Sequence, residues 1–473
     1  MADEERLDMS IQMGSSPAGS ERRDCTPFRI LILGDFHATT HSQDPIEISD
    51  ETLDRAMARL RPKVDVALGD ATISISFERM SDFHPDNLTQ NVAIFGPLMR
   101  LREQLQEPAT FDQAAQEVRS WSSWKPTTEA EEEAATSECD IERLLGRKPM
   151  TSPRKTNSLA QDLIREIVGP SNTPQIDPQQ DDLIATVDQA LSKLLQRLLH
   201  DPDFQAVEAA WRGLDFLANQ VGSDVSLKIF LSHLPKNKLV EEMINTDEIT
   251  HSTFYRIVVD QAVDTLGATP WSLVALTAPI TTTDQDLVCF QRCLTLARAA
   301  QAPVIAEAAA VFAKASEEAP RWSQLRAQPE AALGGLLIAH FLLRRPYGKA
   351  TEAIDSFHFE EMGGHPEPDN FLWGNPIWVL ASLLGQAYNE HGWAMHSDER
   401  HTIGGMPTHC FESERGTEQT PSTLPTLAES DVNTLIQLGL MPLISMRGQD
   451  LVRIARVQSL ASPPKPLKGR WQR

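Results

Sequence analysis

The sequence predicts an α/β (α+β) fold, in which a small α/β domain is joined by a flexible linker to a larger α/β domain. Strand-like and helix-like segments alternate over residues 27–106 and again over residues 181–460. The stretch between them, residues 107–180, is rich in Pro, Thr, Ser and charged residues and lacks the apolar spacing of a packed element. A chain of 473 residues is long enough for two or three hydrophobic cores.

The two ends of the chain are polar. Residues 1–26 have no hydrophobic period and are too polar for a signal peptide, so we expect a disordered arm or one that orders on contact. Residues 444–473 carry seven Lys or Arg residues and one acid. We expect their last part, residues 461–473, to form a basic tail.

The small domain opens with a buried strand, predicted from the continuous apolar run in PFRILILGDF. A helix follows in SDETLDRAMARL, with Ser49 or Asp50 as its N-cap. The segments VDVALGD and ATISISFERM alternate as half-buried strands do. A helix over residues 85–105 then has Pro85 in its first turn and an apolar face formed by Leu88, Val92, Phe95, Leu98 and Leu101.

Two short amphipathic segments, CDIERLLGR and SLAQDLIREIV, interrupt the acidic linker. Each could dock on its own chain or be bound by a partner. We take six of their apolar residues as candidate partner-binding positions: Ile141, Leu144, Leu145, Leu159, Leu163 and Ile167.

The larger domain opens with a helix over residues 183–199, which Pro202 brings to an end. Asp201 or Asp203 can cap the next helix, FQAVEAAWRGLDFLANQV. Strands and helices then alternate through SLKIFLSHL, NKLVEEMI, WSLVALTAPI, TDQDLVCFQRCLTLARAA and APVIAEAA. One more helix, NPIWVLASLLGQAYNEHG, precedes the short strands LMPLISMRG and VRIARVQSL. This order predicts a sheet with helices on its faces.

Composition argues against several classes of protein. The formal charge of −23 opposes general nucleic-acid binding, because phosphate neutralisation needs a high density of basic residues. No apolar run reaches the roughly 18 residues of a membrane span, so no membrane insertion is expected. The five cysteines are an odd number without a framework spacing, and we therefore expect a cytoplasmic protein without disulfides.

The strongest catalytic pattern is Asp35-x-His37, the form with which metallophosphoesterases open a dimetal centre. A second strand-like segment ends at Asp70, where such enzymes place a bridging carboxylate. Two hard divalent ions need several carboxylate and imidazole ligands, but the residues that follow are ATIS and the next histidine is His84. We therefore expect Asp35 to cap a turn at the strand end, and we expect no catalytic residue, metal ligand or cofactor.

Two other groups of reactive side chains have structural interpretations. Cys289 and Cys293 supply only half of a zinc site, and burial in a core explains them better. His409 and Cys410 are adjacent on a strand and point to opposite faces, so the imidazole is badly placed to activate the thiol.

The tryptophans and glycine pairs are the remaining motifs that resemble parts of binding sites. Trp211 and Trp373 lie on or beside apolar helices, which predicts that they pack in a core. The pairs in ALGGLL and TIGGM lack the Lys-Ser/Thr of a P-loop and the spacing of a dinucleotide fingerprint. Neither group indicates a ligand site.

The order of the segments resembles a known family. PFRILILGDFHA, IEISDETLDRAMARL and FERMSDFHPDNLTQNV follow one another as in the small subunit of the type VI secretion contractile sheath. HDPDFQAVEAAWRGLDFLANQV, FLLRRPYG, FHFEE, FLWGNPIWVLASLLGQAYNEHGWAM and LIQLGLMPLISMRGQDLVRIARVQSL follow the order of the large subunit. The resemblance covers residues 26–106 and roughly 180–460, so two subunits that are usually separate chains look fused here.

The resemblance also implies differences from the usual subunits. It stops at VQSLASPPKPLKGRW, whereas large subunits continue with a further C-terminal region, so we expect a C-terminally shortened large subunit. The small subunit's usual C-terminal helical extension is missing unless TFDQAAQEVRSWSSW is its remnant.

The resemblance implies a structural protomer of the sheath and not an enzyme. The implied partners are other sheath protomers, including separate sheath subunits, together with an inner tube ring protein, the baseplate and a disassembling AAA+ ATPase. The ATPase recognises a helix near the start of the large subunit, for which the two linker segments are candidates. Arg453 and Arg456 in the last strand-like segment are further candidate partner-binding residues. The alternative is a non-polymerising sheath-like adaptor that binds sheath or baseplate components.

Overall fold

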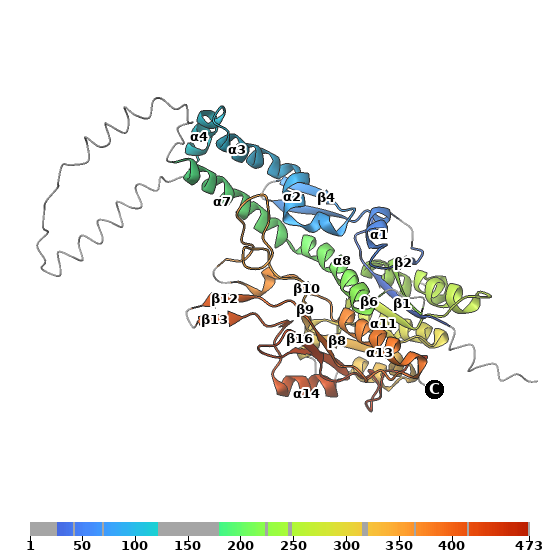
Figure 1. Cartoon of the computed structure of the whole chain (residues 1–473). Helices are drawn as coiled ribbons and strands as arrows, with labels where there is room; N and C mark the ends of the chain where they lie inside the picture. Colours follow the sequence, from blue (N-terminus) through green and yellow to red (C-terminus); the bar gives the residue numbers. More distant parts are fainter. Residues whose placement is uncertain are drawn as a thin grey trace, which may run out of the picture. The chain divides into compact units, whose positions relative to one another are not determined.

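The computed structural model describes residues 26–40, 43–68, 71–121, 179–222, 226–244, 248–314, 320–363, 366–413 and 416–471 (Figure 1). The fold is mixed α/β, as the sequence predicts. It divides into two compact units. Unit 1 comprises Met1–His84, Leu199–Pro346 and Met362–Arg473, and unit 2 comprises Pro85–Leu198 and Tyr347–Glu361.

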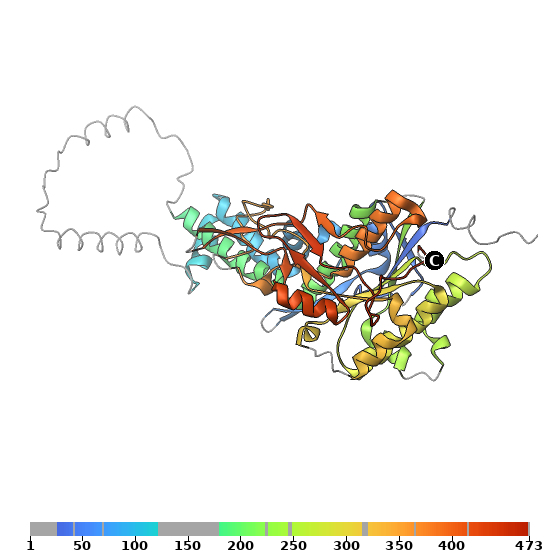
Figure 2. The same cartoon turned by 90° about the horizontal axis from the view of Figure 1, so that it is seen from below.

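A nine-stranded sheet organises unit 1 (Figures 1 and 2), in the order β11-β16-β15-β8-β7-β6-β1-β5-β2. The six strands from β15 to β5 are parallel, β2 and β16 run antiparallel to their inner neighbours, and β11 is antiparallel to β16. In chain order the strands are β1 (Phe28–Gly34), β2 (Ile46–Ile48), β5 (Leu227–His233), β6 (Leu273–Ile280), β7 (Val304–Ala308), β8 (Gly334–Ile338), β11 (Thr402–Gly404), β15 (Leu440–Ser445) and β16 (Leu451–Ile454).

Strand β1 lies inside this sheet, although the sequence suggested that it belongs to a separate small domain. It pairs along its whole length with β5 on one side, and through Ile30–Leu33 with β6 on the other. All of its residues except Arg29 are buried, which is why the run is continuously apolar. The two compact units therefore do not follow the expected boundary at residue 106.

Helices cover both faces of the sheet. On one face α9, α11, α12, α14 and a π-helix form a core with Leu31 and Leu33 of β1. On the other, α13 packs against β1, β6 and β7, and α8 packs against α13. These helices are α8 (Pro202–Val221), α9 (Lys236–Ile244), α10 (Thr253–Tyr255), the π-helix (Arg256–Asp264), α11 (Asp284–Ala300), α12 (Pro320–Ala327), α13 (Ile377–His391) and α14 (Glu429–Gln437).

Short elements complete unit 1. β3 (Lys63–Leu68) and β4 (Ala71–Ser76) form a hairpin that packs on α8, and α1 (Leu53–Leu60) precedes it. β9 (His340–Leu342) pairs with β10 (Trp373–Gly374) and β14 (Thr423–Leu424), and β12 (Cys410–Ser413) pairs with β13 (Gly416–Gln419). The 3₁₀ helices of unit 1 are Met80–Phe83, Ile249–His251, Ala310–Lys314, Pro329–Leu333, Pro368–Asn370 and Gly392–Ala394.

The two predicted helix caps have different outcomes. Asp201 caps α8, and its Oδ1 accepts the N–H groups of the second and third residues that follow it, at 3.0 and 3.1 Å. Neither Ser49 nor Asp50 caps α1, whose N-cap position is Thr52 and which has no side-chain cap bond. The Ser49 hydroxyl instead pairs with Thr52 Oγ1 at 3.0 Å, which closes a turn before the helix. That prediction was wrong.

Unit 2 is mainly helical, and its elements are held together by polar contacts. Arg102 Nε donates to Asp188 Oδ1 at 2.7 Å, which ties α3 to α7. Asp86 of α2 accepts the backbone N–H of Ser356 at 2.9 Å. The helices are α2 (Pro85–Asn91), α3 (Gly96–Gln106), α4 (Phe111–Arg119), α7 (Gln180–Leu199) and the 3₁₀ helix Ala93–Phe95.

The single helix predicted over residues 85–105 is therefore broken into α2, a 3₁₀ helix and α3. The break occurs where Pro97 stands in the first turn of α3 and cannot donate a backbone hydrogen bond to the preceding turn. Four of the five predicted apolar positions are still buried, and Leu98 is partly exposed.

Candidate functional site

The Asp35-x-His37 pattern forms a turn at the end of β1. Asp35 Oδ1 accepts the backbone N–H of His37 at 2.8 Å, which confirms the interpretation of Asp35 as a turn cap. Gly34 is required before it, because a Cβ there would overlap the side chain of Thr277 in β6. Within the described residues, no group of three or more His, Cys, Asp or Glu side chains gathers in a way that could hold a metal ion. Asp70 lies outside those residues.

His233 stands beside this turn but leaves the charge of Asp35 uncompensated. Its Nδ1 is 3.8 Å from Asp35 Oδ1, and the same Nδ1 accepts the N–H of Phe36 at 3.2 Å. Burial lowers the pKa of His233 despite the nearby carboxylate. Because an acceptor nitrogen carries no proton, we assign His233 as a neutral imidazole.

A cavity of about 450 Å³ opens at the carboxyl ends of β1, β6 and β7. Its polar lining comes from Asp35, His37, Lys236, Glu307, His340 and Asn375. Ala206, Ala209 and Ala210 of α8 form one wall, and Trp373 and Trp378 contribute aromatic surface. The cavity therefore combines an apolar wall with a few polar groups, as small-ligand sites usually do.

Glu307 joins two of these polar groups at the end of β7. Its Oε1 is 2.8 Å from His340 Nε2, and its Oε2 accepts the amide of Asn375 at 2.7 Å. Burial alone would lower the pKa of His340, but the hydrogen bond and negative charge of Glu307 outweigh it and raise that pKa. Both carboxylate oxygens of Glu307 thus have hydrogen-bond partners within the cavity wall.

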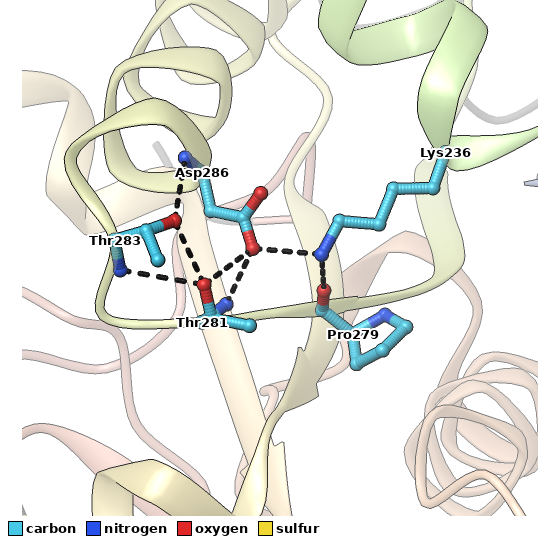
Figure 3. Close-up of polar contacts among 5 residues, drawn as sticks. All are labelled: Lys236, Pro279, Thr281, Thr283 and Asp286. Carbon is cyan, nitrogen blue, oxygen red and sulfur yellow. Dashed lines mark hydrogen bonds and ion pairs between the residues drawn. The ribbon is translucent and has the colours of Figure 1, made fainter.

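Lys236 is held away from the other cavity carboxylates by a network at the start of α11 (Figure 3). Its Nζ donates to Asp286 Oδ2 at 2.7 Å and to the carbonyl of Pro279 at 2.6 Å. Asp286 also accepts the N–H and hydroxyl of Thr281, at 2.9 and 2.7 Å. Burial would raise the pKa of Asp286, but these hydrogen bonds outweigh it and lower that pKa. The lysine charge is therefore neutralised by its own partner.

A second polar group is buried in the motif EAAWRGL of α8. Glu208 has no exposed side-chain surface and accepts Arg212 Nε at 2.6 Å and Arg344 Nε at 2.9 Å. Burial would raise the pKa of Glu208, but the two guanidinium groups outweigh it and hold that pKa below its usual value. This network joins α8 to the segment after β9.

The tryptophan predictions have different outcomes. Trp211 is fully buried and its Nε1 donates to the carbonyl of Phe36 at 3.3 Å, which confirms core packing. Trp373 is only partly buried, because it lies in the short strand β10 at the cavity and not in a helix. Its predicted place in a core was wrong.

Of the three cysteines in the described residues, Cys289 and Cys293 are placed as expected from sequence. Cys289 and Cys293 are buried in the core face of α11. A hydrogen bond with Cys289 and burial raise the pKa of the Cys293 thiol well above its usual range, which makes this thiol unreactive. Cys410 is exposed on β12.

Two of the eight predicted partner-binding residues lie within the described residues. The six apolar linker positions, Ile141 to Ile167, lie outside the described residues. Arg453 is exposed on β16 and Arg456 is exposed just after it. The basic tail is packed up to Trp471: Leu467 is fully buried and the Trp471 ring stacks on Phe28 with centroids 6.0 Å apart.

Sequence reasoning missed the cavity. Glu307, His340 and Asn375 are separated by up to 68 residues, so no local pattern unites them. One signal was available, because a carboxylate at the end of the buried strand VIAEA requires a polar partner.

Family comparisons match most of the chain. The model described as VipB, EvpB/VC_A0108, tail sheath N-terminal domain, matches residues 181–317 and 313–461, together more than half of the sequence. The model described as type VI secretion system, VipA, VC_A0107 or Hcp2, matches residues 3–119.

One curated relative extends this finding. The type VI secretion system sheath protein TssC1 of Pseudomonas aeruginosa is 23% identical over 363 residues, which is 72% of this chain and 69% of that protein. A search of the described helices found none long and apolar enough to cross a membrane. The two matched models come one after the other in a single polypeptide. The chain thus belongs to the type VI secretion sheath family, as a fusion of a VipA (TssB) part with a VipB (TssC) part.

Proposed function

We propose that this sheath protein is the protomer of a contractile tube: copies stack helically around an inner tube, and contraction propels that tube. The observation that carries the proposal is the position of β1 between β5 and β6. A strand from the VipA part is hydrogen bonded on both sides to strands of the VipB part. The fused chain thus forms a single sheet from both sheath parts, as a building block with a fixed composition requires.

Contacts between copies are proposed to use the ends of the sheet. Among the described strands, β2 and β11 stand at the two edges, and each has an inner neighbour only. An edge strand presents unpaired backbone groups that an extended segment of another copy can complete. The same reasoning extends to separate sheath subunits, which could add to either edge.

The remaining partners are proposed from the family. They are the ring protein of the inner tube, the baseplate and a disassembling AAA+ ATPase, which would bind a helix of the segment between the two sheath parts. The role proposed is structural, without catalysis, cofactor, nucleic acid or membrane insertion. The described cysteines are all free, which suits the reducing cytoplasm.

Electron microscopy of the purified full-length chain tests this proposal. Helical tubes in negative stain, which also pellet on ultracentrifugation, are the expected result. A non-polymerising adaptor would give discrete particles at every protein concentration and would bind preformed sheath or baseplate. That outcome would show that the chain acts as an adaptor and not as a sheath protomer.

A further inference from the structure

The 450 Å³ cavity lies at the topological switch point of the sheet. The parallel strands appear in the order β5-β1-β6-β7-β8-β15, so the chain first moves to one side of β1 and then continues on the other. In open α/β sheets, the crevice outside the carboxyl ends of the strands at such a point is where ligands bind. Asp35 after β1 and Thr277 in β6 both line the cavity at this point.

The charge inside the cavity selects the kind of ligand. Lys236 is paired with Asp286, and Glu307 is paired with His340 and Asn375. Asp35 is half exposed, and within the described part of the chain no Lys or Arg forms an ion pair with it. Among the described residues that line the cavity, Asp35 is therefore the carboxylate that no side chain engages through a hydrogen bond.

Three ligand classes fit poorly. A phosphate or carboxylate ligand would be repelled by the charge of Asp35. A metal ion would need at least three ligating side chains, which do not gather among the described residues. A neutral apolar ligand would bury the charge of Asp35 without a partner, which is unfavourable.

The apolar wall limits the ligand further. Ala209 and Ala210 leave room beside α8, and the Trp378 ring lies close against this helix because Gly213 has no Cβ that would overlap it. A compact apolar stem can lie against such a surface. We propose that the cavity binds a small organic cation, with an ammonium or guanidinium group at Asp35 and an apolar stem along the wall of α8.

Calorimetry with two probes of equal size tests the proposal on the full chain at pH 7.5. Phenethylamine is a cation under these conditions and 2-phenylethanol is its neutral counterpart. We expect phenethylamine to bind at least about tenfold more tightly, because the charged group gains a charge-assisted hydrogen bond. Asp35→Asn should remove this preference, since the amide oxygen can still accept the His37 N–H but carries no charge.

Two further variants test whether the preference for the cation depends on Asp35 and on the cavity. Asp431→Asn alters an exposed carboxylate of α14 and should keep the tenfold preference. Ala209→Leu fills the cavity from α8 and should weaken the binding of both probes. Circular dichroism verifies that each variant is folded. Equal affinity for both probes, no saturable binding of phenethylamine, or an unchanged preference in Asp35→Asn would each overturn the proposal. The test does not depend on whether copies polymerise.

Discussion

Glu208 carries its charge without any contact with water, and two arginines make this tolerable. A carboxylate moved from water into a protein interior loses several kcal/mol of hydration, roughly, unless hydrogen-bonded cations replace it. Arg212 comes from the next turn of the same helix, whereas Arg344 comes from 136 residues further along the chain. The pair with Arg344 therefore links two distant segments of unit 1.

Removing the distant arginine should be costly. We expect Arg344→Met to lower the free energy of unfolding by about 3 kcal/mol, since Glu208 would keep only one cation. Urea denaturation followed by tryptophan fluorescence gives this value. Arg321→Met is the matched control, because Arg321 and its partner Asp284 are both exposed and should contribute less than about 1 kcal/mol. Equal losses of unfolding free energy in the two variants would show that the buried Arg344–Glu208 pair contributes no more than an exposed ion pair.

His340 should make stability depend on pH near neutrality. Its pKa is raised in the folded chain, so its stabilising contribution is complete below the ordinary value of 6.5 and is lost as pH rises through the folded pKa. The melting temperature of the wild type should thus fall more than that of His340→Gln above pH 6.5. The effect should be modest because the side chain is 40% exposed. His251→Gln, at an exposed position, should follow the wild type.

At the scale of elements, local sequence patterns predict many of the helices and strands. They do not predict which strands pair when these are far apart in sequence. The apolar run of β1, the helix α7 and the Asp201 cap of α8 were all read from neighbouring residues. The insertion of β1 between β5 and β6 was not, because the paired residues lie about 200 positions or more apart in sequence. The same limit hid the contact between Glu307 and Asn375. Pro97 is a local signal for the helix break, but the apolar face continues across it and favours one unbroken helix.

The place of β1 predicts how a cleaved chain behaves. After proteolysis near Glu131, the two fragments should co-elute in native gel filtration, because β1 has hydrogen bonds to strands on both of its sides. They should separate only in denaturant. A large fragment expressed without β1 should be poorly folded, since the sheet would be open between β5 and β6. Fragments that separate under native conditions would show that the two sheath parts are independent.

At the scale of the whole molecule, a formal charge of −23 makes copies repel one another. Assembly then depends on localised contacts, which a basic segment such as residues 444–473 can supply on an acidic protein. The structure assigns part of that segment to the chain's own fold, because Arg470 lies over the Trp393 ring, 5.2 Å from its centroid. Arg453 and Arg456 are exposed and stay candidates.

Truncations should distinguish the two ends. Deleting residues 462–473 removes Leu467 and Trp471 from contacts with unit 1 and should lower the melting temperature by several degrees. Deleting residues 1–24 should leave melting unchanged and weaken assembly, as measured by sedimentation at low and high salt. If the C-terminal truncation melts like the intact chain, the packing of the tail does not contribute to stability.

The position of β1 also has a consequence for synthesis on the ribosome. Its strand partners are made much later, since β6 begins at Leu273, roughly 240 residues after β1 ends. At about 5–20 residues per second, β1 waits some 10–50 s with its apolar side chains unpaired. During that time the apolar side chains of β1 can contact other nascent chains on the same messenger RNA. Contacts between such strands would compete with the correct pairing of β1 to β5 and β6.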